Sequence, residues 1–461
     1  MYIEQLYTSC LAEAAYYIES EGEAVVIDPM REIEPYLSLS KSRNAKIKYV
    51  FETHFHADFV SGHLDLAKAT GAEIVYGPTA KPNYRVLVAE DYQNFQFGKV
   101  KIQVLHTPGH TMESSCFLLL DESEKPYAVF TGDTLFVGEV GRPDLAVKSD
   151  MTKEDLAGFL FDSIETKIKT LPDDVIVFPG HGAGSSCGKN IGKERQTTIG
   201  IQKKVNYALQ QNSKPEFVKA LLDGLSAPPP YYFVDAVINK TGYENIDSVM
   251  QKNNHLITLA EFISEAENGA LILDTRFEED FAKQHIPDSM NISLSGQFAN
   301  WVGHLIESKT PLVLVTETGK EEESVLRLAR IGYENVKGIL SGGMSTWINS
   351  GKQVSATHCI TAQEFADHFP ASENILDVRN MSEFQNGVVE NSILLPLGNL
   401  QKNLSDLDPQ KQYTVFCGGG YRSMMAISIL EKNGFTKLTN VLGGMAKIKE
   451  TGIKLVAFQN A

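Results

Sequence analysis

The second half of this chain contains one pattern twice, and no other feature restricts its fold as strongly. The segment LILDTR at 271–276 recurs as NILDVR at 374–379, and Gly342-Gly343-Met344 recurs as Gly443-Gly444-Met445. The offset between the copies stays between 101 and 103 residues. Because a pattern that returns at a nearly constant spacing indicates a repeated structural unit, we predict two copies of one α/β unit in this half.

The whole chain has 461 residues, which is too long for one hydrophobic core. Up to about residue 235, short apolar runs of strand length alternate with polar turns. Helical periodicity appears in three places of this region, at 62–70, 153–170 and 197–211. Pro228-Pro229-Pro230 and the following segment 231–254, which ends in four polar residues, indicate the edge of the first domain and a linker. We therefore predict an αββα sandwich, followed by the two α/β units, over residues 1–240, 255–352 and 357–461.

The composition excludes several classes of partner. A formal charge of −16, without a basic cluster, disfavours binding to nucleic acid or to an anionic membrane. Apolar residues make up 43% of the chain, yet no run of about 18 of them suggests a membrane span. The first 20 residues contain glutamates but no Lys or Arg, so we expect a cytoplasmic protein without a leader. The five cysteines lack CxxC pairing, which disfavours a disulfide framework.

Four side chains that commonly bind metals each come shortly after a strand-like run of the first domain: His54, His110, Asp133 and His181. Ligands at strand ends converge on one edge of a sheet sandwich. Two more candidates, His56 and Asp58, stand beside His54 in the segment THFHADF, and Cys187 follows His181 closely enough to be a candidate for the rim of such a site. The pattern therefore predicts a metal centre.

The segment THFHADF resembles the HxHxDH signature of the metallo-β-lactamase superfamily, in which a second metal takes a histidine where this chain has Phe59. A dinuclear zinc hydrolase needs five or more ligands and a bridging aspartate, and a phenyl ring has no lone pair to give. A second metal would keep only Asp58, His181 and a share of Asp133. We therefore expect one metal. Two histidines and one carboxylate with open positions suit non-haem Fe(II) and O2.

The segments HFHADFVSGH, TPGHT, TGDTLF, VGRPDL and PGHGAGSSCG together resemble the persulfide dioxygenases of the metallo-β-lactamase superfamily, whose HxHxDH signature has histidine where this chain has Phe59. The resemblance implies mononuclear Fe(II) with three open coordination positions. Its ligands would be His54, His110 and Asp133, while His56, Asp58 and His181 would orient ligands or waters. The resemblance also places Arg142 near the thiol substrate, where a guanidinium could hold a carboxylate or phosphate.

Cys417 stands between a strand-like run, 413–416, and an apolar helical segment that starts at Met424. A thiolate at a helix entrance is stabilised by the helix dipole and by backbone N–H groups. Three glycines, Gly418, Gly419 and Gly420, can take positive φ and let the chain curl round the sulfur. Arg422 adds a fixed positive charge near a bound anion. This loop predicts a cysteine that carries sulfane sulfur.

The loop CGGGYR resembles the CxxxxR loop of the rhodanese family, whose units are small doubly wound parallel sheets. The resemblance implies that Cys417 and Arg422 are catalytic and that Gly418, Gly419, Gly420 and Tyr421 contact the substrate. A phosphatase loop has five residues rather than four between Cys and Arg, which makes a larger ring. The first copy has Val315 or Thr316 in place of the cysteine, so we predict that it is silent in sulfur transfer.

Asp377 and Arg379 recur in the silent copy as Asp274 and Arg276. A catalytic pair has no reason to persist in a copy without the catalytic cysteine. We therefore interpret both pairs as structural.

The order of domains resembles bacterial fusions of persulfide dioxygenase and rhodanese. This resemblance implies oxidation of a glutathione, coenzyme A or bacillithiol persulfide by O2 to sulfite and thiol, followed by transfer of sulfane sulfur through Cys417 to or from sulfite, giving or consuming thiosulfate, in sulfide detoxification. We also expect a homo-oligomer. One alternative is a zinc thioester hydrolase of the glyoxalase II type with an accessory sulfurtransferase. Another is a sulfur carrier or sensor with a vestigial metal domain.

Overall fold

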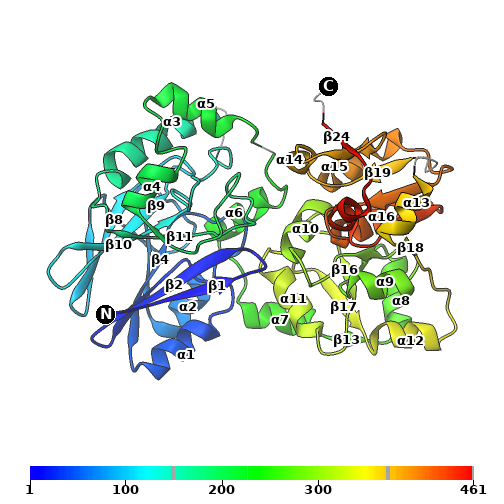
Figure 1. Ribbon diagram of the computed structural model, residues 1–461. Helices are drawn as coiled ribbons and strands as arrows, with labels where there is room; N and C mark the ends of the chain where they lie inside the picture. Colours follow the sequence, from blue (N-terminus) through cyan, green and yellow to red (C-terminus); the bar gives the residue numbers. More distant parts are fainter. Residues whose placement is uncertain (147–150, 226, 370–373, 459–461) are drawn as a thin grey trace. The chain divides into compact units, whose positions relative to one another are not determined.

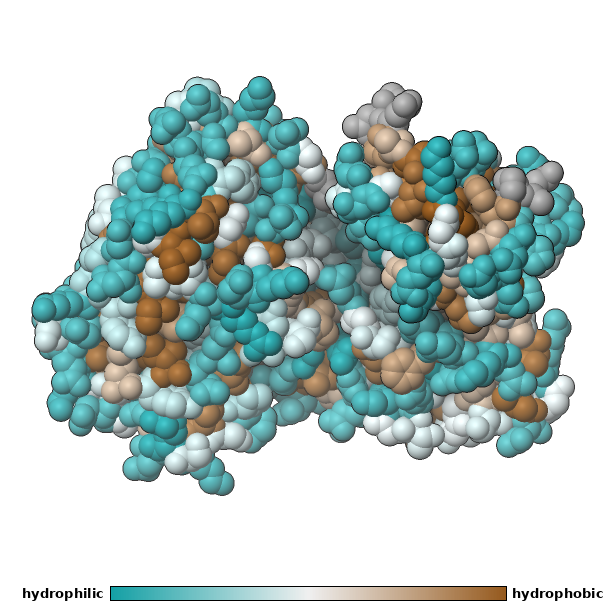
Figure 2. Space-filling model, viewed as in Figure 1, coloured by the Kyte–Doolittle hydropathy of each residue, from teal (hydrophilic) through white to brown (hydrophobic). Residues whose placement is uncertain are grey.

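The computed structural model describes residues 1–146, 151–225, 227–369 and 374–458 (Figure 1). The chain folds into two compact units. The first comprises Met1–Val249 with Ala329–Gly332, and the second comprises Met250–Leu328 with Tyr333–Ala461. Among the described residues, no helix has the length and apolar character needed to cross a membrane. The surface seen in Figure 2 is mainly hydrophilic, and apolar side chains show through in small patches.

Two six-stranded sheets form the centre of the first unit. The strands of the first sheet are, in spatial order, β1 (Tyr2–Thr8), β2 (Glu13–Ser20), β3 (Glu23–Ile27), β4 (Lys46–Glu52), β5 (Glu73–Tyr76) and β6 (Leu87–Val88). The second sheet contains β12 (Thr197–Thr198), β11 (Ile176–Pro179), β10 (Pro126–Gly132), β9 (Ser115–Leu120), β8 (Val100–His106) and β7 (Asn94–Phe97). Aromatic side chains join the sheets in a common core, as where the rings of Phe51 and Phe117 lie 4.9 Å apart.

Helices cover the outer face of each sheet. Tyr36 of α1 (Glu34–Ser42) and Leu66 of α2 (His63–Thr70) pack on the first sheet. The second sheet is covered by α3 (Lys153–Ser163), the π-helical turn Ile164–Ile168, α4 (Ile199–Val205) and α5 (Lys214–Leu222). These four layers confirm the predicted αββα sandwich. The helix predicted at 197–211 is shorter, because Thr197–Thr198 pairs with β11 and Thr198 then caps α4 through the Ile201 amide.

The segment predicted as a linker is instead mostly helical, in α6 (Tyr232–Thr241) and α7 (Ile246–Asn253). Asn239 of α6 is buried, and its amide donates to the carbonyls of His56 and Phe59 at 2.8 and 2.7 Å. The Asn239 side chain also accepts from the Ser61 amide. These hydrogen bonds tie α6 to the loop that contains His56, Phe59 and Ser61, so α6 packs as part of the first unit rather than as a linker.

The second unit contains two five-stranded parallel sheets with the same strand order. One consists of β13 (Leu256–Ile257), β17 (Val336–Leu340), β16 (Leu312–Val315), β14 (Leu271–Asp274) and β15 (Met290–Asn291). The other consists of β18 (His358–Ile360), β23 (Leu438–Val441), β22 (Tyr413–Phe416), β19 (Ile375–Asp377) and β21 (Ile393–Leu394). A small ladder of β20 (Val388–Val389) and β24 (Leu455–Val456) accompanies the second copy. The predicted repeat is confirmed.

Helices alternate with these strands in both copies. The first copy has α8 (Leu259–Glu267), α9 (Glu278–Lys283), α10 (Phe298–Leu305), α11 (Glu321–Ala329) and α12 (Gly343–Asn349). The second has α13 (Ala362–His368), α14 (Met381–Phe384), α15 (Leu397–Leu400), α16 (Tyr421–Lys432), α17 (Gly444–Ile448) and the 3-10 turns Gln401–Asp406 and Lys449–Thr451. The first helix of each copy begins with a capping box, Thr258 with Glu261 and Thr361 with Glu364. The repeat therefore extends to local capping chemistry.

The strand registers identify the residue of the silent copy that matches Cys417. Asp274 pairs with Val315 in the first copy, as Asp377 pairs with Phe416 in the second. Thr316 therefore occupies the place of Cys417. In each copy the aspartate also binds the arginine two residues later through two nitrogens, and all four side chains are buried.

Candidate functional site: a metal centre and a cysteine loop

His54, His110 and Asp133 meet at one end of the first unit, with their ligand atoms within 4.8 Å of one another. His54 follows β4, His110 lies between β8 and β9, and Asp133 follows β10 directly. All three are buried, and Nε2 of His110 lies 3.4 Å from Oδ2 of Asp133. The strands β3 and β4, and likewise β10 and β11, run parallel, so their carboxyl ends bring such residues to one edge.

The polar atoms of this group are short of partners. Nε2 of His110 and both carboxylate oxygens of Asp133 have no hydrogen-bond partner among the described residues. Nδ1 of His110 lies 2.8 Å from the carbonyl of Arg142 and must carry the proton, which leaves the lone pair on Nε2. Burial, with the neighbouring His56 and His110, lowers the pKa of His54, so this imidazole is neutral. A cation would satisfy all these groups.

His56 is turned away from this group towards two buried carboxylates. Its Nε2 lies 3.0 Å from Asp28 and 3.6 Å from Glu52. Burial opposes the charged imidazole, but Asp28 and Glu52 outweigh it and raise the pKa of His56 to about 9. A protonated imidazole has no lone pair for a metal. His56, Asp28 and Glu52 lie within 4.8 Å of one another and form a group separate from His54, His110 and Asp133.

Asp28 was missed by the sequence analysis, although it follows β3 directly. Its carboxylate accepts from the Thr53 amide at 2.7 Å and from the Thr53 hydroxyl at 2.8 Å. The Thr53 hydroxyl in turn lies 2.9 Å from Nδ1 of His54. The backbone of Asp28 has a φ of 49°, a conformation that costs a non-glycine residue about 1–3 kcal/mol. These contacts over-determine that conformation, and Asp28 holds the ligand loop.

A second group lies on the other side of Asp133. Nε2 of His181 is 3.3 Å from Oδ2 of Asp58 and 3.5 Å from Oδ1 of Asp133. Cys187 joins Asp58 and His181 within 4.8 Å. Asp133 therefore presents one oxygen to each group. Phe59 is fully buried, with its ring 4.4 Å from that of His56.

Arg142 is fixed beside the centre by its backbone as well as by its side chain. Its amide donates to the carbonyl of Cys187 at 3.0 Å. Its guanidinium pairs with Asp144 through two nitrogens at 2.7 and 2.8 Å and donates to the carbonyl of Ser186. The thiol-binding role of Arg142 stays a prediction.

The Cys417 loop closes over a buried sulfur. The amide of Gly420 donates to Sγ of Cys417 at 3.1 Å, and Cys417 is 1% exposed. Of the three loop glycines only Gly420 has a positive φ, 111°, which corrects the expectation that all three provide the curl. At Gly418 a Cβ would lie 2.8 Å from the guanidinium of Arg422, so a larger residue there would have to displace Arg422.

The second copy of the Gly-Gly-Met motif, at residues 443–445, packs against the Cys417 loop. The amides of Met445 and Ala446 donate to the carbonyls of Cys417 and Gly418 at 2.7 and 3.0 Å. A Cβ on Gly444 would meet the Cys417 carbonyl oxygen at 2.3 Å. The motif recurs because each copy packs a helix start against the loop after its central strand.

Glu383, which the sequence analysis did not single out, holds Arg422. Both guanidinium NH2 groups of Arg422 donate to the Glu383 carboxylate, one at 2.5 and the other at 2.8 Å. Burial opposes ionisation of Glu383, but hydrogen bonds from Arg422 and the Asn380 amide outweigh it and lower the pKa of Glu383. The hydroxyl of Tyr421 donates to the carbonyl of Ser293 in the silent copy.

A cavity of about 630 Å³ lies beside this ion pair and has walls from both copies. The silent copy contributes Glu278, Ser295, Gly296, Gln297 and Trp301, and the other contributes Asn380, Glu383, Tyr421 and Arg422. Both copies therefore shape the space beside Arg422.

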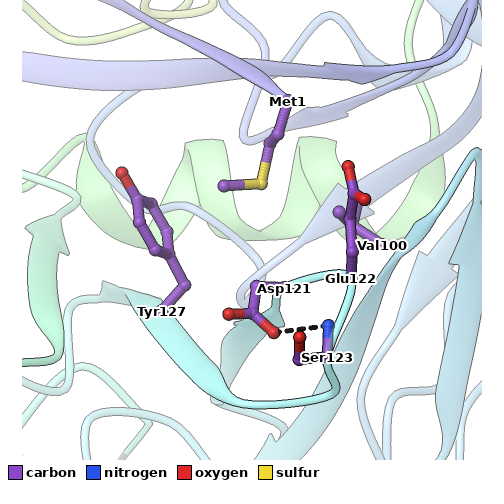
Figure 3. A pocket seen from close by; sticks show the side chains of 6 residues that line it. All are labelled: Met1, Val100, Asp121, Glu122, Ser123 and Tyr127. Carbon is purple, nitrogen blue, oxygen red and sulfur yellow. Dashed lines mark hydrogen bonds between the residues drawn. The ribbon is translucent and has the colours of Figure 1, made fainter.

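A hollow of about 260 Å³ lies apart from both sites, near the turn between β9 and β10 (Figure 3). It is lined by Met1, Val100, Asp121, Glu122, Ser123 and Tyr127. The Asp121 carboxylate accepts from the Ser123 amide and so serves the turn itself.

The two halves of the chain match different protein families. The family model described as metallo-beta-lactamase superfamily matches residues 9–181, and that described as rhodanese-like domain matches residues 258–350 and 361–451. A metallo-beta-lactamase structure from Staphylococcus aureus subsp. aureus COL is 31% identical with a TM-score of 0.66, covering 74% of this chain and 98% of that one.

Four curated relatives each match less than half of this chain. The mitochondrial persulfide dioxygenase of Homo sapiens is 30% identical, over 45% of this chain and 74% of that protein. The hydroxyacylglutathione hydrolase GloC of Haemophilus influenzae is also 30% identical, over 42% of this chain and 91% of that protein. The chain spans 66% and 60% of the length of two probable hydroxyacylglutathione hydrolases of Schizosaccharomyces pombe, with 31% and 32% identity.

The geometry predicts different effects for two neighbouring histidines on metal content. His110→Ala removes an imidazole whose Nε2 faces Asp133, so the purified variant should lose most of its bound metal. His56→Gln should retain the metal, because its ring faces Asp28 and Glu52. Metal per chain, measured by plasma mass spectrometry, checks this. Equal losses in both variants would contradict the assignment of His56 to the carboxylates.

The charge on His56 predicts how the stability of metal-free protein depends on pH. The folded-state pKa, about 9, lies above the ordinary value of 6.5, so the stabilising charge is fully present below pH 6.5 and is lost as pH rises through 9. The thermal midpoint of metal-free protein should therefore fall between pH 7 and pH 9.5. In His56→Gln the thermal midpoint should depend less on pH. A fall as large as that of the unmodified protein would contradict the role assigned to the His56 charge.

Proposed function

Because this chain belongs to the metallo-beta-lactamase superfamily and carries two rhodanese-like domains behind that domain, we propose that it is a persulfide dioxygenase joined to a sulfurtransferase. The first unit would oxidise the persulfide of a low-molecular-weight thiol with O2 and water to sulfite and free thiol. It would use one Fe(II) held by His54, His110 and Asp133. The observation that carries this proposal is a buried group of two imidazoles and one carboxylate, beside a phenyl ring where a dinuclear hydrolase needs a ligand.

The residues present fit such a metal. The unpartnered, buried Nε2 of His110 and the Asp133 oxygens are the donors that the ion requires. When bound, Fe(II) would supply open positions for O2 and the persulfide and would relay electrons between them.

The chain itself would fix the ligands and exclude bulk water. The Arg142 carbonyl holds the tautomer of His110, and Thr53, anchored by Asp28, holds His54. Asp58 and His181 would orient waters or substrate from the far side of Asp133. Because the whole group is buried, its electrostatic interactions act in a low dielectric.

The substrate would be the persulfide of glutathione, coenzyme A or bacillithiol, each of which has carboxylate or phosphate groups for a cation to hold. We propose Arg142 for this contact because its backbone anchors it at the centre. Binding would then require the substrate to compete with Asp144 for the guanidinium, or to share it.

The second rhodanese-like copy would move sulfane sulfur through Cys417. The Cys417 thiolate would attack the outer sulfur of a persulfide, the S–S bond would break, and the thiol would leave as a thiolate. Sulfite would then attack the outer sulfur of the Cys417 persulfide, which releases thiosulfate and restores the Cys417 thiolate. The Gly420 amide would stabilise the thiolate in both steps, and Arg422, placed by Glu383, would face the anion.

A zinc thioester hydrolase is the second candidate, and the hydroxyacylglutathione hydrolase relatives favour it. Such a reaction would need no O2. Phe59 counts against it, because it removes an imidazole from the second metal position.

The two activities should separate in one pair of variants. Protein purified without O2 and assayed for iron should consume O2 with glutathione or coenzyme A persulfide, and His110→Ala should abolish this uptake. Cys417→Ser should keep the uptake but release sulfite and form no enzymatic thiosulfate, because only the sulfur carrier is lost. Cys359→Ser, in the same unit but outside the loop, is the matched control and should behave as the unmodified chain does. Loss of O2 uptake in Cys417→Ser would contradict this division.

A further inference from the structure

The cavity beside Arg422 carries an unbalanced negative charge. Its wall contains two carboxylates, Glu278 and Glu383, and one guanidinium, that of Arg422. Glu383 and Arg422 pair with each other through two hydrogen bonds. Glu278 of the silent copy forms no ion pair with the residues that the structure describes, and the Ser295 hydroxyl lies 3.4 Å from one of its oxygens. The silent copy therefore presents one carboxylate to the cavity without a cation beside it.

The cations of the silent copy near Ser295 are held by a different carboxylate. Lys320 and Arg327 line a neighbouring cavity of about 160 Å³, which Ser295 also lines. Both of them pair with Glu323, Lys320 at 2.7 Å. Burial raises the pKa of Glu278, because these cations do not offset its loss of water. A cation brought by a ligand would stabilise the Glu278 carboxylate.

The helix that begins at Glu278 does not depend on this carboxylate alone. The first turn of α9 has three acids, Glu278, Glu279 and Asp280. Asp280 pairs with Lys283 at 2.8 Å, and Glu279 is exposed. Of the three, only Glu278 lines the cavity. Two other acids thus complement the helix dipole, and Glu278 is the one placed to meet a ligand.

The same wall contains an aromatic ring, and the space has the size of a ligand site. Trp301 lines the cavity and is 9% exposed. The face of an indole ring attracts a cation, which adds to the attraction of a carboxylate in the same wall. The volume of about 630 Å³ lies within the range of about 300 to 1,000 Å³ that is usual for small-molecule sites.

The two copies are fixed to each other at this cavity. The Tyr421 hydroxyl donates to the carbonyl of Ser293 at 2.9 Å. A Cβ on Gly296 would lie 2.7 Å from the Tyr421 ring, so this ring packs directly on the silent copy. Because Tyr421 follows the loop glycines, this contact sets the position of the wall relative to the Cys417 loop.

We propose that this cavity selects sulfur carriers that bear an ammonium group, which Glu278 and Trp301 of the silent copy bind while the persulfide reaches Cys417. The inference rests on the proposed sulfur transfer through Cys417 and names the class of carrier. Glutathione has such a group in its γ-glutamyl residue, and bacillithiol has one in its cysteinyl residue. Coenzyme A has none and would bring phosphates to an acidic wall. The ammonium group anchors the carrier and takes no part in the exchange of the S–S bond.

A probe that cannot transfer sulfur tests the binding step alone. S-methylglutathione and its analogue without the α-amino group are each titrated by calorimetry into the full chain carrying Cys417→Ser. The probe with the ammonium group should bind roughly tenfold more tightly. Adding Glu278→Gln should remove this difference, whereas Glu279→Gln, in the same turn of α9, should keep it. Binding to the first unit would be common to all these proteins and would not change with Glu278.

The transfer step is measured separately and without O2, so that the first unit does not consume the donor. The chain with Cys417 intact is mixed with the persulfide of glutathione, of the analogue without the amino group, or of coenzyme A. Persulfide on the Cys417 peptide is then followed by mass spectrometry after alkylation. Glutathione persulfide should load Cys417 fastest, and Glu278→Gln should slow this loading roughly tenfold without slowing the other two donors.

Equal binding of the two probes, or a difference that survives Glu278→Gln, would overturn the proposed selection and leave sulfur transfer through Cys417 standing. Discrimination that depends on Glu278, in a chain whose Cys417 takes up sulfur from none of the donors, would instead support the ammonium site and contradict the proposed transfer.

Discussion

The buried carboxylate of Asp133 is the constraint on which the first unit depends. Its two oxygens face two groups of potential ligands, and neither oxygen has a hydrogen-bond partner among the described residues. An unpaired carboxylate in the interior is unstable unless a cation accompanies it. The parallel ends of β10 and β11 bring Asp133 and His181 together, and β3 and β4 bring Asp28 and His54 to the same edge. The sandwich thus buries carboxylate oxygens at one edge, where a metal cation would stabilise them.

The second unit is built from two copies of one scaffold. Both copies keep the buried Asp–Arg pair, the capping box and the Gly-Gly-Met turn, because these features build the α/β fold. The two copies differ at the position that we propose for sulfur transfer. Thr316 stands in place of Cys417, and the silent copy retains a wall of the cavity beside Arg422. The fold and the proposed sulfur chemistry would therefore depend on separate residues, so one copy can lack the cysteine and keep its structure.

Much of this arrangement was predictable from the sequence. Ligand-type residues after apolar runs predicted a centre at the sheet edge, and the 101 to 103 residue offset predicted the second unit. Three features were not predictable. The tertiary contacts of Asn239 turn an apparent linker into a support, and the pairing of Glu383 with Arg422 joins residues far apart in sequence. The orientation of His56 depends on the buried acids Asp28 and Glu52, which no local pattern reveals.

The central claim is that the metal of the first unit reacts with O2, and a metal exchange tests it most directly. One batch of metal-free protein is divided and reconstituted with Fe(II) or with Zn²⁺, and each half is given glutathione persulfide and a glutathione thioester. Our account predicts O2 uptake by the iron form alone, with about one O2 per persulfide, and little thioester hydrolysis by either form. Thioester turnover by the zinc form, with no O2 uptake by the iron form, would contradict it.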